Sequence, residues 1–212
     1  MIVELITPKE EFARMERTAA ESTLTCHDNV GKMNAEGYKP SDTLKNIITW
    51  GHESTLEHIT LSYRVKDLSR ACLQELARHR HISLSVESTR HTLKQKIESG
   101  EIKNYLPPTS TVELYQLVSS YFFSLTEFLR MNPDTPNDLL KYVIPECVCT
   151  NLVMSANIRE LRHIIKVRTH PFALAEFQEL ARKIYEVVPD EFKYLLEDCL
   201  YKKAENRWEV SK

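Results

Sequence analysis

The sequence predicts an α+β fold, and two patterns in its apolar residues lead to that prediction. Most apolar residues recur at the three- to four-residue spacing of amphipathic helices, whereas only a few short stretches alternate or run continuously as strands do. Internal repeats and low-complexity tracts are absent from the sequence. The length of 212 residues favours a single domain, 1–212, with a sizeable core.

The N-terminal quarter predicts one strand and two helices. Residues 2–6 are expected to form the strand, and Thr7 is expected to cap a helix that ends near Thr25. Residues 28–40 contain two glycines and many polar side chains, which predicts a loop. Ser41 is expected to cap the short helix that follows this loop.

The middle of the chain contains the clearest strand. Residues 59–66 alternate between apolar and polar side chains, which is typical of a half-buried strand. Ser69 is expected to cap a helix that ends around residues 78–80, and residues 82–92 predict a polar loop or an irregular strand. The longest helix is expected at residues 111–131, where apolar side chains keep helical spacing.

Shorter elements complete the predicted order. Prolines end the long helix and separate several of the segments that follow it. We expect a short helix at 137–143, a buried strand at 147–156, helices at 158–167 and 173–187, and a last helix after Pro189.

The charge balance and the scarcity of glycine limit how this chain could bind an anion. The formal net charge is -2, so no global positive field would attract nucleic acid or an anionic membrane. Only 4 glycines occur, and they are not spaced for a G-x-G-x-x-G turn or a Walker A loop. A bound nucleotide would therefore depend on side chains, above all on clustered arginines.

Cysteine usage and hydropathy bear on the compartment. The 5 cysteines are odd in number and include no Cys-x-x-Cys pair, which disfavours a disulfide framework or a zinc ribbon. No segment approaches the ~20 consecutive apolar residues of a membrane span, and the first residues lack the apolar region of a signal peptide. We therefore expect a cytoplasmic protein without membrane contact.

Arginines, histidines and serines gather between residues 78 and 90. Arginine presents a planar, permanently charged fork that matches phosphate or the carbonyl oxygens of a pyrimidine, and serine hydroxyls can add donors. Alternatively, these cations only interact with the carbonyl groups at a helix end and form a solvated surface. On composition alone the two explanations are about equally good. The cluster comprises Arg78, His79, Arg80, His81, Ser83, Ser85, Ser88 and Arg90.

A second cluster of basic residues follows Asn157. On a helix, Arg159, Arg162 and His163 would lie within about one turn of one another, which costs stability unless an anion lies between them. The alternative is a solvated helix face on which Glu160 provides a local partner. Two separate arginine clusters in a chain of net charge -2 favour one polyanionic ligand.

A third group combines histidines with carboxylates just before the alternating strand. His52, Glu53, Glu57 and His58 contain side chains that could hold a metal ion. The two histidines are six residues apart, which does not fit an H-E-x-x-H helix. A polar loop before the strand is the better explanation.

Together these segments resemble the flavin-dependent thymidylate synthases. The resemblance runs from roughly Leu44 to Leu200, and its most specific part is Arg78-His79-Arg80 followed, after seven residues, by Ser88. The variant Gln74-Glu75-Leu76-Ala77 before this signature resembles a bacterial subgroup. Two further blocks occur in the expected order, namely Gly51-His52-Glu53-Ser54 with Glu57-His58 upstream, and Asn157-x-Arg159 with His163 and Arg168 downstream.

The resemblance implies both an architecture and a reaction. The fold would be a central, mostly antiparallel sheet flanked by helices, in a homotetramer whose active sites lie at subunit interfaces. The enzyme would be a methyltransferase that converts dUMP to dTMP. Methylenetetrahydrofolate would donate the carbon, and FAD reduced by NADPH would donate the hydride.

The resemblance also assigns roles to individual residues. Arg168 would be catalytic, because a fixed positive charge near the carbonyl oxygens of uracil polarises and activates the ring. Contacts to FAD are implied for Ser54, Arg78, His79, Arg80, Val86, Asn157, Ile158, Arg159 and His163. Contacts to dUMP are implied for Glu75, Leu76, Ala77, Arg78, Ser88, Thr89, Arg90, Lys141 and Arg168.

Several positions depart from the family pattern. Ser85 and Val86 occupy two positions that are usually Asn-Glu, and Glu87 falls one place later, so Val86 is expected to contribute only its backbone. His91 replaces a frequent tyrosine, and Lys141 stands where the family often has an arginine.

Two other classes of function remain open from the residues alone. A nucleic-acid-binding helical module would use residues 78–90, although the net charge of -2 counts against it. A metal-dependent hydrolase would use His52, Glu53, His58 and His79. Ser88 is a candidate nucleophile, but it lacks an obvious activating triad, so we expect it to bind dUMP.

Overall fold

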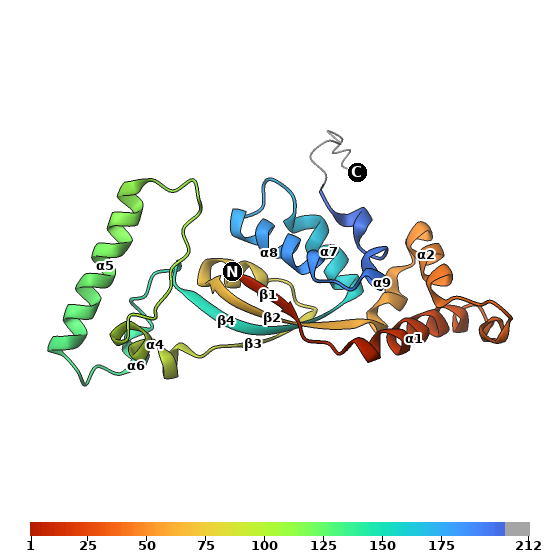
Figure 1. Cartoon of the computed structure of the whole chain (residues 1–212), viewed down its shortest axis with the longest axis horizontal. Coiled ribbons are helices and arrows are strands. Elements are labelled where there is room, and N and C mark those ends of the chain that lie inside the picture. Colours follow the sequence, from red (N-terminus) through yellow and green to blue (C-terminus); the bar gives the residue numbers. More distant parts are fainter. Residues whose placement is uncertain (202–212) are drawn as a thin grey trace. The chain divides into compact units, whose positions relative to one another are not determined.

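The computed structural model describes residues 1–201 and confirms the predicted α+β class. Helices dominate, and four strands form an antiparallel sheet in the order β1-β2-β4-β3 (Figure 1). The strands are β1 (Ile2–Leu5), β2 (Thr60–Ser69), β3 (Ile82–Val86) and β4 (Cys149–Asn157).

The described chain divides into two compact units. β1, β2 and β4 each contribute residues to both of them. A single domain over 1–212 stays a prediction, and its residues 202–212 lie outside the described part. The first unit comprises residues 1–4 and 63–154, and the second comprises residues 5–62 and the chain from Ser155 onward.

In the first unit, β2 leads directly into the helix α3 (Arg70–Leu76). Tyr63 and Val65 are buried on one face of β2, as the alternating pattern predicts, while Arg64 on the other face pairs with a carboxylate of β1. The predicted cap at Ser69 is confirmed, because its hydroxyl accepts a hydrogen bond from the backbone N–H of Cys72 at 3.0 Å. The helix ends earlier than expected, so the basic cluster begins beyond its last turn.

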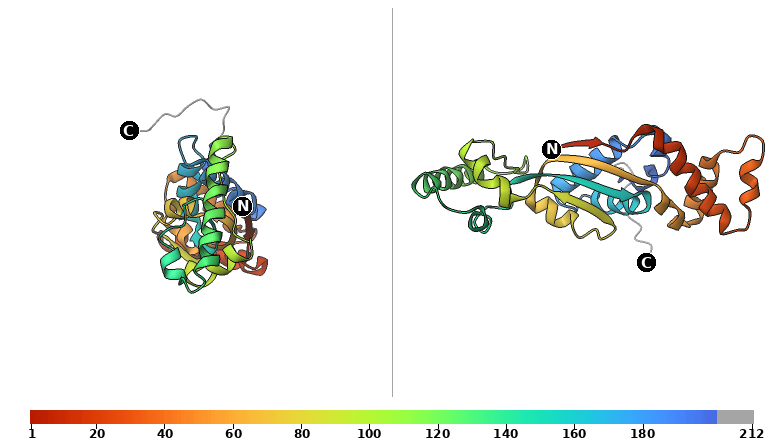
Figure 2. Two further views of the ribbon diagram at one scale, coloured as in Figure 1. Left: turned by 90° about the vertical axis from the view of Figure 1, so that its left-hand side faces the viewer. Right: turned by 90° about the horizontal axis from the view of Figure 1, so that it is seen from below.

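The rest of the first unit contains three helices with their own apolar cluster. α5 (Val112–Met131) is the long helix of this unit (Figure 2). The hydroxyl of its N-cap residue, Thr111, accepts from the N–H of Leu114 at 3.4 Å. α4 (Thr89–Glu98) and α6 (Asn137–Leu140) contribute Leu93, Ile97 and Leu140 to the cluster, and α5 contributes Leu125 and Leu129.

The structure corrects the prediction of a polar loop or irregular strand at residues 82–92. A regular strand, β3, occupies 82–86, and α4 begins at Thr89. Leu93 and Ile97 are the only residues of α4 that are buried, and one apolar pair is too short a pattern to reveal a helix in the sequence. Their packing against the other helices stabilises α4 instead.

In the second unit, α1 (Phe12–Thr25) packs against α2 (Pro40–Trp50), as Figure 1 shows. The predicted cap at Thr7 is wrong, because its hydroxyl accepts from the backbone N–H of Ser62 at 2.7 Å, and a short 3-10 helix, η1 (Lys9–Glu11), precedes α1. The predicted cap at Ser41 is also wrong. Proline suits the first position of a helix, so α2 begins at Pro40 and Lys39 is its N-cap residue. The loop predicted at 28–40 contains a 3-10 helix, η2 (Val30–Asn34).

The C-terminal helices of the second unit form its core. Asn157 caps α7 (Ile158–Arg168), since its Oδ1 accepts from the N–H of Glu160 at 2.9 Å. α7 packs against α8 (Ala175–Glu186). Short elements follow at α9 (Asp190–Lys193) and the 3-10 helix η4 (Glu197–Cys199). The fully buried side chains include Ile158, Leu161, Ile164 and Ile165 of α7, with Phe177, Leu180 and Ile184 of α8.

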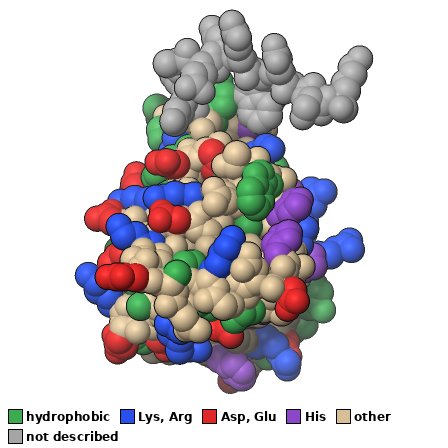
Figure 3. Space-filling model, turned by 90° about the vertical axis from the view of Figure 1, so that its right-hand side faces the viewer, with side chains coloured by type: hydrophobic (Ala, Val, Ile, Leu, Met, Phe, Trp, Pro, Cys, Tyr) green, Lys and Arg blue, Asp and Glu red, His purple; other side chains and the backbone are tan. Residues whose placement is uncertain are grey.

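The surface carries charges of both signs. On the face drawn in Figure 3, acidic and basic side chains are interspersed. Among residues 1–201, no helix combines the length and the apolar character needed to cross a membrane.

Candidate nucleotide-binding site

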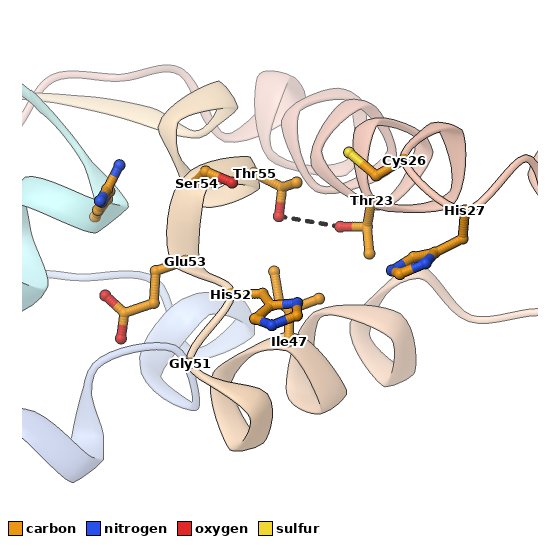
Figure 4. A pocket seen from close by; sticks show the side chains of 10 residues that line it. Thr23, Cys26, His27, Ile47, Gly51, His52, Glu53, Ser54 and Thr55 are labelled. Atoms are coloured by element: carbon orange, nitrogen blue, oxygen red, sulfur yellow. Dashed lines mark hydrogen bonds between the residues drawn. The ribbon is translucent and has the colours of Figure 1, made fainter.

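A pocket of about 350 Å³ lies in the second unit, among α1, α2, the 3-10 helix η3 (Glu53–His58) and α7. Gly51 makes the turn that forms it. Its φ of 72° is in the left-handed region, where glycine avoids the clash of a Cβ, and the N–H of His52 then bonds back to the carbonyl of Ile47 at 2.9 Å. This turn ends α2 and brings the segment from His52 to Thr55 to the pocket wall (Figure 4).

Two residues that the resemblance assigns to FAD line this pocket together. Ser54 comes from η3 and Arg159 from the first turn of α7. Both are exposed, so their polar groups are accessible to a ligand. The structure therefore brings together two predicted residues that are more than a hundred positions apart in the sequence.

The opposite wall comes from the end of α1, and no sequence motif pointed to it. Thr23 lies in the last turn of α1, Cys26 and His27 directly follow the helix, and the hydroxyls of Thr23 and Thr55 are hydrogen-bonded at 3.0 Å. Figure 4 shows the rings of His27 and His52 beside the same space. The sequence signal that could have found this wall is the i, i+3, i+4 spacing of polar residues before the loop at 28–40.

The basic cluster on α7 does not act as one cationic group. Nη1 of Arg159 lies 2.5 Å from a carboxylate oxygen of Glu57 and remains exposed. Arg162 is buried and pairs with Glu53 and Asp198. Burial would lower the pKa of Arg162, but hydrogen bonds and attraction from its acidic partners outweigh burial and raise it.

The other predicted residues of the second unit differ in accessibility. His163 is exposed on α7, whereas the side chain of Ile158 is fully buried and only its backbone could meet a ligand. Asn157 is half-buried and caps the helix. The guanidinium of Arg168 lies over the ring of Phe177, 4.5 Å from its centroid, in a cation–π contact.

In the first unit, the residues around the Arg-His-Arg signature differ in burial. Arg78 and Arg80 are exposed, and Nη1 of Arg78 lies 3.6 Å from Glu75. His79 between them is buried. Leu76 is also fully buried, so it can offer a ligand only its backbone, whereas Ala77 is exposed.

The segment after β3 is held by a network around Glu87. Its carboxylate accepts hydrogen bonds from Thr92 at 2.8 Å and Asn151 at 2.7 Å, and it lies 2.5 Å from Nζ of Lys96. Burial would raise the pKa of Glu87, but these donors and the charge of Lys96 lower it below its usual value. Val86 ends β3 and is 38% exposed.

Predicted dUMP contacts gather at the start of α4. Ser88 is exposed, and its hydroxyl makes no capping bond within the described chain. Thr89 is half-buried beside it, and Arg90 donates two hydrogen bonds to Asp138 at 2.7 and 3.0 Å. The hydrogen bond from Arg90 lowers the pKa of Asp138, and the positive charge of the exposed Lys141 lowers it further.

Comparison with known proteins identifies the family. Residues 3–192 match the family described as thymidylate synthase complementing protein. The chain is 34% identical to the flavin-dependent thymidylate synthase of Campylobacter jejuni (strain RM1221), over 88% of this chain and 93% of that protein. The chain belongs to the flavin-dependent thymidylate synthases. It is therefore an FAD-dependent enzyme of this class.

Further relatives agree with this assignment. The flavin-dependent thymidylate synthase of Helicobacter pylori (strain 26695) is also 34% identical, over 86% of this chain and 93% of the relative. A crystal structure of thymidylate synthase X from Helicobacter pylori, with FAD and dUMP, superposes with a TM-score of 0.81 at 30% identity and covers 95% of this chain and 100% of that one.

The two other function classes gain no support. The matched family and the relatives support neither a nucleic-acid-binding module nor a metal-dependent hydrolase. Within residues 1–201, no three histidine, cysteine or acidic side chains gather in a way that could hold a metal ion.

Proposed function

We propose that this flavin-dependent thymidylate synthase converts dUMP to dTMP, with methylenetetrahydrofolate as the carbon donor and NADPH as the source of reducing equivalents. The observation that carries the proposal is the pocket in which Ser54 and Arg159 meet, two residues expected to contact FAD. The similar Helicobacter pylori structure contains FAD and dUMP.

Each unit by itself carries side chains that suit a flavin nucleotide. The pocket offers the hydroxyl of Ser54, the guanidinium of Arg159 and two imidazoles, while Ile47 adds an apolar surface. Exposed Arg78 and Arg80 are donors of the kind that a pyrophosphate needs where a glycine-rich loop is absent. His79, Val86, Asn157, Ile158 and His163 complete the proposed contacts, and the bound flavin would supply the hydride.

Residues at the start of α4 suit a nucleoside monophosphate. Arg90 and Lys141 provide positive charge, and Ser88 provides a hydroxyl that is not used as a cap in the described chain. Glu75, Leu76, Ala77, Arg78 and Thr89 are the further proposed contacts.

Arg168 has the chemistry to activate the pyrimidine. Its charge is permanent, and its guanidinium contacts the face of the Phe177 ring. A charge that is fixed before the reaction needs no reorganisation as negative charge develops on a uracil carbonyl oxygen. We propose that Arg168 supplies this charge.

The proposal includes a cytoplasmic homotetramer with active sites at subunit interfaces. Large apolar side chains exposed in the first unit support association with further copies. They include Leu117, Phe123 and Met131 of α5, with Leu139 and Tyr142 on and after α6, and these are 60–87% exposed.

The test is a reconstituted reaction. The purified protein should show a flavin spectrum and should form dTMP only when dUMP, methylenetetrahydrofolate and NADPH are all present. Arg168→Ala should nearly abolish dTMP formation in a folded protein. Arg17→Ala, a control at an exposed arginine of α1 outside the proposed site, should leave the rate unchanged. Wild-type turnover by Arg168→Ala would remove this residue from the mechanism, and absence of dTMP with all components present would reject the proposed function.

A further inference from the structure

Arg162 ties together three separate segments of the second unit. Its side chain is 7% exposed, and its Nε donates to Glu53 of η3 at 2.9 Å. Its Nη1 and Nη2 donate to the two carboxylate oxygens of Asp198 in η4, at 2.7 and 2.6 Å. Nη1 also donates to the carbonyl oxygen of Leu195. A buried guanidinium is costly unless it is fully paired, so this arrangement tolerates little displacement.

The pocket wall depends on this arrangement. η3 is a 3-10 helix of 6 residues that has no side-chain cap within the described chain, and such short helices are weak on their own. Two arginines of α7, one turn apart, hold its two glutamates, because Arg159 pairs with Glu57 and Arg162 pairs with Glu53. Ser54 lies between the two attachment points.

Arg162 and Asp198 lie outside the set of residues that line the pocket, whereas Glu53 belongs to it. A change at Asp198 can therefore act on the pocket only indirectly. Arg162 provides a direct path from Asp198 to Glu53, and Glu53 is next to Ser54 in the chain.

We propose that Arg162 is a positioning residue for the flavin-nucleotide pocket, and that through it Asp198 of the C-terminal segment sets the affinity of the pocket for FAD. This inference rests on the proposed function of the pocket. Asp198→Asn removes the negative charge and turns an N–H donor toward a guanidinium that has only donors. The guanidinium must then shift relative to Glu53, and η3 loses its fixed attachment.

The central experiment compares two identical substitutions in the same C-terminal segment. Asp198→Asn should weaken FAD binding to the full-length protein about tenfold. Losses of this size occur at metal sites when a residue that holds a direct ligand in place is replaced. Asp190→Asn is the matched control, since Asp190 is 90% exposed and pairs with the neighbouring Lys193 at 2.7 Å. It should leave FAD affinity unchanged. At saturating FAD, the kcat of Asp198→Asn should stay within about twofold of wild type, because the reacting groups are intact.

A double-mutant cycle tests the path. If the effect passes through Glu53, then Asp198→Asn should add little to the loss of FAD affinity in a Glu53→Gln background. Additive losses, or an Asp198→Asn protein that binds FAD as wild type does, would overturn the inference. Should Asp198→Asn fail to fold, Arg162→Lys replaces it, because a lysine keeps the charge but cannot engage both carboxylates in the same way, and the same loss is expected.

Hydrogen exchange separates this inference from the proposed function. The backbone amides of residues 53–58 should exchange faster in Asp198→Asn than in Asp190→Asn, whether or not FAD is present. If the wild-type protein bound no FAD, the proposed function would fail, and the exchange rates would still decide whether Asp198 holds η3. Equal exchange in the two variants would show that it does not.

Discussion

Replacing Asn157 with alanine should destabilise the protein by about 1–2 kcal/mol, the upper part of the range for loss of an N-cap. The Oδ1 of Asn157 accepts from the N–H of Glu160 at 2.9 Å, and Glu160 is only 8% exposed. Water therefore has limited access to the N–H that loses its acceptor. For a chain of this length, the melting temperature should fall by about 2–8 °C.

The assay is thermal unfolding followed by circular dichroism, with Asn157→Asp as the paired variant. Aspartate caps a helix as well as asparagine does, and its charge is favourable at the N-terminus of α7. Its melting temperature should lie within about 2 °C of the wild type. If Asn157→Asp melts as early as Asn157→Ala, the capping bond does not account for the stability of α7 and the reasoning is wrong.

The same pair separates the cap from the proposed contact with FAD. The cap uses the carbonyl oxygen Oδ1, which aspartate retains, whereas aspartate lacks the amide donor Nδ2. If Nδ2 donates to FAD, Asn157→Asp should be stable but should bind FAD more weakly than wild type. Wild-type affinity in this variant would limit Asn157 to the role of a cap.

Three further predictions follow from the described contacts. Leu161→Ala should destabilise the protein by about 2–5 kcal/mol in urea unfolding, because Leu161 is fully buried in α7. Arg90→Ala should raise the KM for dUMP without a measurable change in melting temperature, since the Arg90–Asp138 pair is largely exposed; an unchanged KM would argue against a dUMP contact at Arg90. The third concerns acid. Burial would raise the pKa of Asp198, but Arg162 lowers it below the ordinary 3.8. The Arg162–Asp198 pair therefore stabilises the fold above pH 3.8. This stabilisation is lost as the pH falls through the lower pKa that Asp198 has in the folded state. The difference in melting temperature between wild type and Asp198→Asn should therefore be present near pH 5 and vanish in stronger acid, whereas a constant difference would contradict the assigned pairing.

Local signals predicted much of the fold. The alternation at residues 59–66 identified β2, and the predicted cap at Ser69 is present, because it depends on a hydrogen bond to an N–H three residues away. The cap predicted at Thr7 failed for a reason outside its neighbourhood, since the N–H of Ser62 takes its hydroxyl oxygen. A capping motif competes with tertiary partners that the local sequence does not show.

In the candidate site, too, local motifs predicted residues, whereas contacts with residues far away in the sequence could not be predicted. Sequence motifs indicated Ser54 and Arg159, but they could not distinguish Arg159 from Arg162, which share a helix and a residue type. Arg162 differs from Arg159 because it is paired with Glu53 and Asp198. Glu53 is 109 residues and Asp198 is 36 residues from Arg162 along the chain. The α1 wall of the pocket was missed because neither its residue types nor their order match a known motif.

The network around Glu87 has a consequence for how tightly a substrate can be held. Lys96, Thr92 and Asn151 already fix the turn that leads from β3 to Ser88. The turn loses its conformational freedom when the protein folds. A nucleotide that binds against Ser88 therefore does not have to order the turn, and this entropy cost does not reduce its affinity. Breaking the network should then slow productive docking and speed release, even though Glu87 itself need never touch the nucleotide.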